Sequence, residues 1–535
     1  MTTPRATVAA GPLFQRASSG LVREGGTFDT LIYNIQFITP GLAITIMLLF
    51  LPAFYPGLNL YAALLIGVAV CLPTTIVYAM LSATIPRSGA DYVWVSRIIH
   101  PVLGAMTSIS FTVLWLFYNQ LPASWIASYG LSPLFRQIGL VQHSEALYNL
   151  GIWFGTNWGQ FIVAAIAIAF YTGVFIFGLR VFFRIQNVMF AIVTGGLIIT
   201  AIAIAVISFG AFQHGINSAL AWKTGDPNSF ATVLKSASKA GFIASAPFDF
   251  KQTLLGLSWI YLTFVFGISS AYIGSEIQRA RRVQLWAIPV ATLYATAWAL
   301  VLFWLVSRTG ALQFIGAADF VGGGPFAGST TFSELFGYAM PLAVAIIIGI
   351  TFTLWFAGPL PNQMLNTSRN ILAYGLDGLV PRRLAEVNER FNSPVVNLIF
   401  VMVGSWVFLA LFRFTTIFAT LSAFLAYTLT FATVSLAAAL LPFRRRELFE
   451  TSPVRWRIFH IPVITVVGVL SIACQGIAAW VYLTDPLDGL VGNVPMIIIN
   501  LVIFGGGVVV YLLAKTFWRT RGYDLDANYR ELPVE

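Results

Sequence analysis

Long apolar stretches alternate with short polar segments along the whole chain. A helix needs about 20 apolar residues to cross roughly 30 Å of hydrocarbon, and windows of that length occur twelve times. The predicted spans are residues 27–51, 60–84, 103–129, 159–178, 184–210, 253–276, 284–307, 337–362, 395–412, 415–441, 461–483 and 494–516. The pattern therefore predicts an all-α polytopic membrane protein with twelve transmembrane helices.

Two of these spans are interrupted near the middle, the first and the sixth. The interrupting residues are Thr39, Pro40 and Gly41 in the first span and Phe266, Gly267, Ile268 and Ser269 in the sixth. Proline has no N–H for the helix, and glycine carries no side chain that resists unwinding. Paired interruptions in two halves of a chain point to a transporter's binding site. Packing kinks are the alternative, because Pro and Gly are common in membrane helices.

Composition agrees with a membrane protein and excludes a soluble one. The chain is 58% hydrophobic and only 9% charged, whereas ordinary soluble domains are about one-quarter charged. Residues 1–26 are polar and lack the apolar core of a cleavable signal peptide, so the first span is expected to direct insertion. Cys71 and Cys474 lie within apolar runs and are expected to be packing residues.

The net charge of +10 is distributed as an orientation signal. Lys and Arg gather at the ends of apolar spans, which is typical of membrane topology and does not favour a nucleic-acid partner. With the N-terminus inside, 23 of the 30 Lys and Arg residues face the cytoplasm, and four of the other seven lie in one long loop, residues 211–252. We therefore expect a multi-pass protein of the cell membrane with both termini cytoplasmic. The loop fits either a short surface helix or an irregular segment.

The interrupted first and sixth spans fit two five-helix repeats of opposite topology, followed by two extra helices. The predicted organisation is a cytoplasmic N-terminal tail (1–26), a first inverted repeat with spans one to five (27–210), an extracellular loop (211–252), a second inverted repeat with spans six to ten (253–441), spans eleven and twelve with the preceding basic cytoplasmic loop (442–518), and a cytoplasmic C-terminal tail (519–535).

The acidic residues do not favour catalysis inside the membrane. All 20 of them lie at span ends or in loops, so the buried acid–base pair or ligand cluster that an intramembrane enzyme requires is not expected. A relay of intramembrane carboxylates is disfavoured for the same reason. Asp29, near the cytoplasmic end of span one, is a secondary candidate for gating or proton exchange, although the helix dipole alone also favours an acid there.

The two interruptions predict a site for a small zwitterion. Free N–H groups at half-helix N-termini suit a carboxylate, and unwound carbonyls suit an ammonium group or Na⁺. An α-amino acid carries both charges close together. The expected substrate-binding residues are Ile38, Thr39, Pro40, Gly41, Leu42, Tyr118, Asn119, Phe264, Phe266, Gly267, Ile268 and Ser269. The aromatic rings of Tyr261 and Phe264 are expected to cover the ligand as a gate.

Three segments on the predicted cytoplasmic side carry motifs of a known family. Residues 85–104, IPRSGADYVWVSRIIHPVLG, are similar to the pattern between helices two and three of the amino acid–polyamine–organocation (APC) transporters. Residues 367–394, TSRNILAYGLDGLVPRRLAEVNERFNSP, resemble the stretch after helix eight, and residues 274–282, GSEIQRARR, resemble the run that closes helix six. Because all three occur in order and at the right spans, the chain resembles an amino acid permease over nearly its whole length.

The resemblance implies the leucine-transporter-type 5+5 inverted-repeat fold, with broken helices 1 and 6 and alternating access around a midplane site. The family's G-S-G motif then corresponds to residues 39–41, and its F-x-G-x-[ED] motif to residues 264–269. Arg87, Glu276 and Arg369 correspond to a cytoplasmic gate.

The chain departs from the family pattern at three places. Pro40 removes one N–H donor from the first motif, and no acid follows Gly267 in the second. Val193 stands where some members carry a lysine that replaces a sodium ion. Coupling through such a lysine is therefore not expected.

These features predict a secondary active transporter that moves amino acids by alternating access, coupled to H⁺ or Na⁺ or working by exchange, with no other cofactor. The expected partners are the amino acid and the lipid bilayer. Members of the family that are linked to a second subunit use a disulfide on an extracellular loop. No cysteine lies in a predicted extracellular loop here, so no obligatory disulfide-linked subunit is expected.

Two alternatives remain open. The first is an organic amine or polyamine carrier of the same fold. It is less favoured, because such a site needs acidic side chains to pair several ammonium groups and the acids here lie at span ends or in loops. A channel or a non-transporting membrane sensor is less favoured, because no repeated filter-like segment is present.

Overall fold

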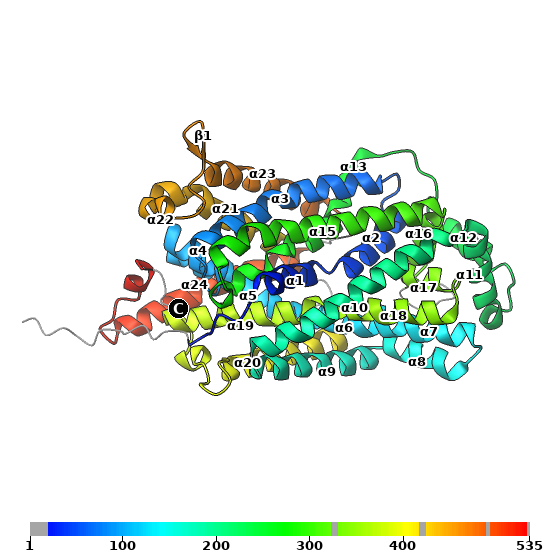
Figure 1. The fold of residues 1–535 in the computed structure, drawn as a ribbon, viewed down its shortest axis with the longest axis horizontal. Helices are drawn as coiled ribbons and strands as arrows, with labels where there is room; N and C mark the ends of the chain where they lie inside the picture. Colours follow the sequence, from blue (N-terminus) through cyan, green and yellow to red (C-terminus); the bar gives the residue numbers. More distant parts are fainter. Residues whose placement is uncertain (1–19, 323–329, 417–423, 488–492, 532–535) are drawn as a thin grey trace, which may run out of the picture.

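The computed structural model describes residues 20–322, 330–416, 424–487 and 493–531. Within this part of the chain, twelve segments are long and apolar enough to cross a membrane. They lie side by side in one elongated bundle (Figure 1). Each overlaps one of the predicted spans, so the prediction of an all-α polytopic protein with twelve transmembrane helices is confirmed.

The first five spans come from residues 27–206. They are α1 (Thr27–Ile38) with α2 (Pro40–Phe54), α3 (Leu60–Thr84), α5 (Pro101–Tyr118) continued by α6 (Gln120–Trp125), the π-helical turn η1 (Ile126–Leu131) and α7 (Ser132–Val141), α9 (Asn157–Ile176), and α10 (Leu179–Val206). Two shorter helices connect them, α4 (Ala90–Ile98) and α8 (Glu145–Gly155).

The other seven spans follow from residue 250. They are α13 (Phe250–Leu255) with α14 (Leu257–Phe264) and the 3-10 segment η2 (Val265–Tyr272), α15 (Ala280–Arg308), α18 (Leu342–Ala357) with α19 (Pro359–Asp377), α20 (Val395–Phe414), α21 (Phe424–Arg444), α23 (Val463–Thr484) and α24 (Val494–Arg519). The shorter elements are α11 (Phe209–Thr224), α12 (Ser229–Lys239), η3 (Gly274–Glu276), α16 (Leu312–Phe320), α17 (Phe332–Gly337), η5 (Arg382–Ala385), α22 (Arg446–Glu450), η6 (Leu525–Tyr529) and an antiparallel hairpin of β1 (Arg457–Ile458) and β2 (Ile461–Pro462).

The two ends of the bundle carry different elements. α4, α22, β1 and the C-terminus lie at one end, which we call the terminal end, and α11, α12, α16 and α17 lie at the other, the opposite end (Figure 1). α12 shows that the helical alternative for loop 211–252 is the correct one. It packs on α16, where the rings of Phe230 and Phe314 stack with centroids 4.3 Å apart.

Two spans extend more than ten residues beyond their predicted ends. The third continues to Val141 and the eighth to Asp377. Each extension contains a buried arginine, Arg136 in the third span and Arg369 in the eighth. Their charges lower the hydropathy of the windows that include them, so the predicted spans end before them. Each arginine is paired with a glutamate in the fold, which the linear pattern does not show.

The first and sixth spans form the centre of the bundle. In each of them 83% of the most apolar stretch is buried inside the protein, compared with 22% in α24 and 28% in α20. Peripheral helices turn large apolar side chains outward, as expected for contact with lipid. The two interrupted spans are therefore surrounded by protein, where irregular backbone is tolerated.

Candidate functional site

The backbone of the first span leaves the helical conformation at Thr39. This residue stands between α1 and α2 with φ 53° and ψ 74°, in the left-handed region. A β-branched residue rarely adopts this conformation, which costs on the order of 1–3 kcal/mol. The Thr39 hydroxyl donates to the carbonyl oxygens of Gln36 (3.0 Å) and Phe37 (3.2 Å). It therefore satisfies carbonyl oxygens at the C-terminal end of α1 and does not cap the N-terminus of α2.

The first turn of α2 consequently presents backbone donors. The first N–H groups of a helix have no acceptor within the helix, and Pro40 at the first position has no N–H. The Thr39 side chain makes no capping bond to α2. The N–H groups of Gly41 and Leu42 are therefore the donors at this helix end, where the helix dipole favours negative charge.

The sixth span changes from α-helix to the tighter 3-10 form over residues 265–272. Hydrogen bonds hold this segment to the first and eighth spans. The Ser270 N–H donates to Oδ1 of Asn34 at 2.7 Å, and Nδ2 of Asn366 donates to the Ser269 hydroxyl at 2.9 Å. The Tyr33 hydroxyl donates to Oδ1 of the same asparagine at 2.9 Å. α1, η2 and α19 thus form one hydrogen-bonded unit.

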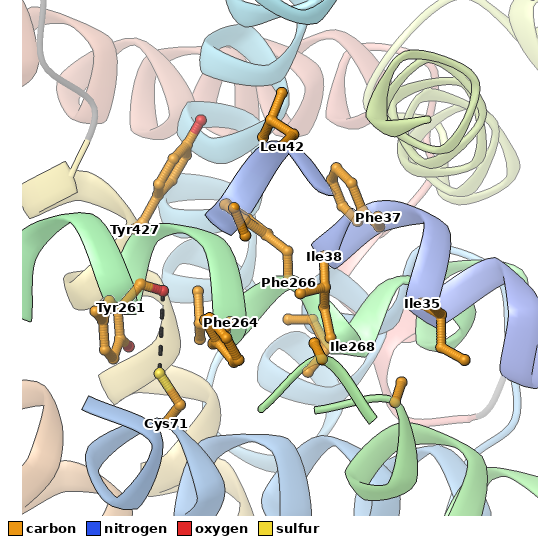
Figure 2. Close-up of a cluster of buried hydrophobic side chains, with 14 of the residues drawn as sticks. Ile35, Phe37, Ile38, Leu42, Cys71, Tyr261, Phe264, Phe266, Ile268 and Tyr427 are labelled. Carbon is orange, nitrogen blue, oxygen red and sulfur yellow. Dashed lines mark hydrogen bonds between the residues drawn. The ribbon is translucent and has the colours of Figure 1, made fainter. Parts of the chain in front are cut away.

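A cavity of about 480 Å³ lies beside the two irregular segments. This volume is within the range of roughly 300–1,000 Å³ that is usual for small-molecule sites. Its lining includes four of the residues predicted from the sequence, Ile38, Leu42, Tyr118 and Phe266. Figure 2 shows Ile38, Leu42 and Phe266 grouped around the junction of α1 and α2. The structure therefore brings the two interrupted spans to one cavity.

The rest of the lining is mostly aromatic and apolar. The aromatic residues that the sequence interpretation did not assign to the site are Phe37, Trp115, Trp125, Trp259, Phe412, Phe424 and Tyr427. Polar side chains come from Thr263, Gln363 and Asn493, in addition to the tyrosines. The described lining residues include no Asp, Glu, Lys or Arg. The rings were missed because aromatic residues are spread through all spans, and only the density of rings at residues 115–125 was a usable signal.

The two predicted glycines contact protein and are not part of the lining. A Cβ added to Gly41 would lie 2.4 Å from Cδ1 of Trp355. A Cβ added to Gly267 would lie 2.8 Å from Oγ1 of Thr292 and 3.0 Å from Cδ1 of Ile38. Both glycines therefore allow the irregular segments to pack closely against neighbouring helices.

The other predicted binding residues are buried behind the lining, and their roles in binding stay predictions. They are Thr39, Pro40, Asn119, Phe264, Ile268 and Ser269. Asn119 donates from Nδ2 to the Ser405 hydroxyl at 3.0 Å. Phe264 and Ile268 lie in the apolar cluster that backs the junction (Figure 2).

The predicted gate residue Tyr261 faces away from the cavity. Its hydroxyl donates to Oε1 of Gln475 on α23 at 2.6 Å, and Figure 2 shows its backbone beside Cys71 of α3. Tyr261 and Phe264, the two rings expected to cover the ligand, are thus both outside the lining, whereas the predicted binding residue Phe266 belongs to it.

Two buried ion pairs lie toward the terminal end of the bundle. Arg369 donates from Nε and Nη2 to the Glu276 carboxylate at 2.6 and 2.8 Å. Arg97 of α4 donates from Nη2 to both oxygens of Asp377, at 2.7 and 2.5 Å. All four side chains are at most 4% exposed. Glu276 and Arg369, two of the three residues predicted for the cytoplasmic gate, are therefore paired directly.

Arg87, the third predicted gate residue, lies half-buried in the loop between α3 and α4. This loop packs on η3, the short 3-10 turn after η2, since the Ser88 and Ser275 hydroxyls are 2.6 Å apart. The N-terminal segment joins them through the Gly25 N–H, which donates to the Glu276 carbonyl at 2.9 Å. The three segments form one layer at the terminal end.

The comparison with protein families gives a match for most of the chain. The model described as amino acid permease matches residues 34–509, a range that contains the interruptions of both spans, the residues that line the cavity and the buried ion pairs. No curated protein matches the chain. Because the family match extends over far more than half of the sequence, the chain belongs to the amino acid permeases of the APC superfamily, a family of membrane transporters for amino acids.

Proposed function

We propose that the chain moves an amino acid across the cell membrane by alternating access, with the cavity of about 480 Å³ as its substrate site. The observation that carries the proposal is the position of this cavity beside both irregular segments. The N–H groups of Gly41 and Leu42 suit the substrate carboxylate. The carbonyls of the altered backbone in the sixth span suit its ammonium group.

The chemistry of the lining favours a substrate with a large apolar or aromatic side chain. Aromatic rings from five spans surround the cavity, among them Trp115, Trp259 and Phe266. Burying an apolar side chain of the size of Leu or Phe in such a site contributes about 1.5–3 kcal/mol. A polyamine finds no carboxylate among the described lining residues, so this alternative is not favoured.

The bundle also has the asymmetry that alternating access requires. The terminal end is closed by the pairs Arg369–Glu276 and Arg97–Asp377. The cavity extends instead toward Leu487 and Asn493, at the ends of α23 and α24 away from the C-terminus. With both termini in the cytoplasm, as the Lys and Arg distribution predicts, this conformation faces outward.

Thermal stabilisation of the purified full-length protein tests the proposal. Each of the twenty amino acids and common amines is added with and without Na⁺, and large apolar amino acids are expected to raise Tm. Leu42→Trp fills the cavity and should weaken binding at least about tenfold, equivalent to about 1.4 kcal/mol. Leu429→Trp is the matched control, because Leu429 is 46% exposed on the outer face of the bundle. Stabilisation by polyamines alone, or equal binding by both variants, would overturn the proposal.

A further inference from the structure

A buried carboxylate lies below the cavity and takes part in neither ion pair. Asp91 is in the first turn of α4, outside the twelve spans, and its side chain is 0% exposed. Among the described residues, neither carboxylate oxygen has a hydrogen-bond partner of standard geometry. Removing an ionised carboxylate from water without a counter-ion is so costly that such a group is held neutral instead.

The groups that face Asp91 are hydroxyls and rings. α3 contributes Tyr78, η2 contributes Tyr272, α19 contributes Tyr374 and α5 contributes Ser108. From α21, the ring of Phe431 contacts Tyr78, with centroids 5.8 Å apart. In the described part of the chain, the hydroxyls of Tyr78 and Tyr272 also have no hydrogen-bond partner. A carboxyl and two tyrosine hydroxyls thus form one buried cluster.

The nearby cations are already paired with other groups. On α4, Arg97 bonds Asp377, and on α19, Arg369 bonds Glu276. Burial therefore raises the pKa of the Asp91 carboxyl from 3.8 to about 7, and the smaller opposing effects come from the Ser108 and Tyr272 hydroxyls and the first-turn N–H groups of α4.

Asp91 is also connected to the substrate cavity by direct packing. The Tyr272 ring lies edge-to-face against Trp115, with centroids 4.7 Å apart, and Trp115 lines the cavity. On its other side, α4 carries the pair that closes the terminal end. Asp91 therefore lies between the cavity and the ion pairs that must separate when the terminal end opens.

We propose that Asp91 is the proton-binding site of this transporter, so that a proton is the coupling ion. The inference rests on the proposed function. In the closed conformation the buried carboxyl holds its proton. When the terminal end opens, water reaches Asp91, the O–H bond breaks, and the proton passes to water on the cytoplasmic side. If the pKa of Asp91 returns from about 7 to its ordinary value of 3.8, the carboxyl binds its proton about a thousandfold more weakly.

Transport in proteoliposomes tests the inference with the full-length protein. An acid-outside pH gradient should stimulate amino acid uptake by the wild type. In Asp91→Asn the stimulation by the pH gradient should be at least about tenfold weaker than in the wild type. Counterflow should remain, because the neutral amide replaces the protonated carboxyl. Asp319→Asn is the matched control, since burial likewise raises the pKa of Asp319, to about 6, at the opposite end. Wild-type accumulation that depends on Na⁺ alone, or an Asp91→Asn variant still driven by the pH gradient, would overturn the inference.

Infrared difference spectroscopy supplies a readout that does not depend on transport. The C=O stretch of a protonated carboxyl should be present in the wild type and in Asp319→Asn at pH 6.5, roughly half a unit below the pKa of about 7. It should be much weaker in Asp91→Asn, where only the partly protonated Asp319 carboxyl, with its pKa of about 6, still contributes, and it should be shifted in Asp91→Glu. Loss of counterflow for every amino acid in the wild type would contradict the proposed function while the infrared band still supports the proton site. Absence of the band from the wild-type spectrum would overturn the proton site even if transport is found. This comparison needs only the wild type, so it remains available if Asp91→Asn does not fold.

Discussion

Replacing Gly41 with alanine distinguishes a glycine that serves helix packing from one that admits the ligand. The new Cβ would lie 2.4 Å from Cδ1 and 2.5 Å from Cγ of Trp355, whereas carbon atoms in contact are about 3.5–4.0 Å apart. The overlap is thus about 1 Å. Trp355 is 0% exposed, and its Nε1 donates to the Val193 carbonyl at 3.2 Å, so the ring cannot yield without losing that bond. Overpacking of this kind costs about 1–3 kcal/mol.

The assay is reversible unfolding of the purified protein in a fixed detergent, together with ligand affinity. Gly41→Ala should lose about 1–3 kcal/mol of stability. Gly195→Ala is the matched control, because a Cβ there meets no atom within 4 Å, and its stability should change by no more than about 1 kcal/mol. In a double-mutant cycle with Trp355→Ala, the two changes should couple by about 0.5–3 kcal/mol.

The opposite pattern would refute this reasoning. If Gly41→Ala is as stable as the wild type and shows no coupling energy with Trp355→Ala, the glycine does not serve helix packing. A selective loss of ligand affinity in that variant would then indicate that the missing side chain of Gly41 admits the substrate to the N–H groups of α2 and does not serve helix packing.

Three further predictions concern charged groups. Glu276→Gln leaves the Arg369 cation buried, which should destabilise the closed terminal end by about 3–5 kcal/mol and speed hydrogen exchange over residues 273–278; unchanged exchange would contradict the gate. Glu334→Gln should cost a similar amount by isolating Arg136, whose Nη2 lies 2.8 Å from the Glu334 carboxylate, but it should leave exchange at residues 273–278 unaltered. Burial raises the pKa of Asp319 to about 6 from 3.8, so the folded chain binds this proton more tightly than the unfolded chain. Stability should therefore fall by at most about 3 kcal/mol as pH rises from about 4 to 6, and Asp319→Asn should flatten that fall in denaturant titrations.

The sequence was sufficient for the number and approximate place of the spans, because crossing a bilayer demands long apolar segments that any window detects. It also located Thr39, since proline and glycine interrupt helices for local reasons. It did not show that the third span continues past the charged Arg136, because the partner that stabilises this charge, Glu334, is 198 residues away in the sequence. Long-range pairs of this kind are invisible in a linear pattern.

The lining of the candidate site was predicted less completely than the fold. Position in the sequence places a residue near an interruption, but it does not say which way the residue faces. Ile38 and Leu42 line the cavity, whereas Gly41 between them packs on Trp355. Asp91 was grouped with loop acids because it is far from any span centre, and only the packing of tyrosines from other helices shows that it is buried.

The central claim is that the cavity binds an amino acid and carries it across the membrane. Counterflow in proteoliposomes tests this most directly, with unlabelled amino acid inside and the radiolabelled form outside. The account predicts saturable uptake that internal substrate accelerates, strongest for large apolar amino acids and abolished in Leu42→Trp. Flux that neither saturates nor responds to internal substrate, or uptake that Leu42→Trp leaves intact, would contradict it.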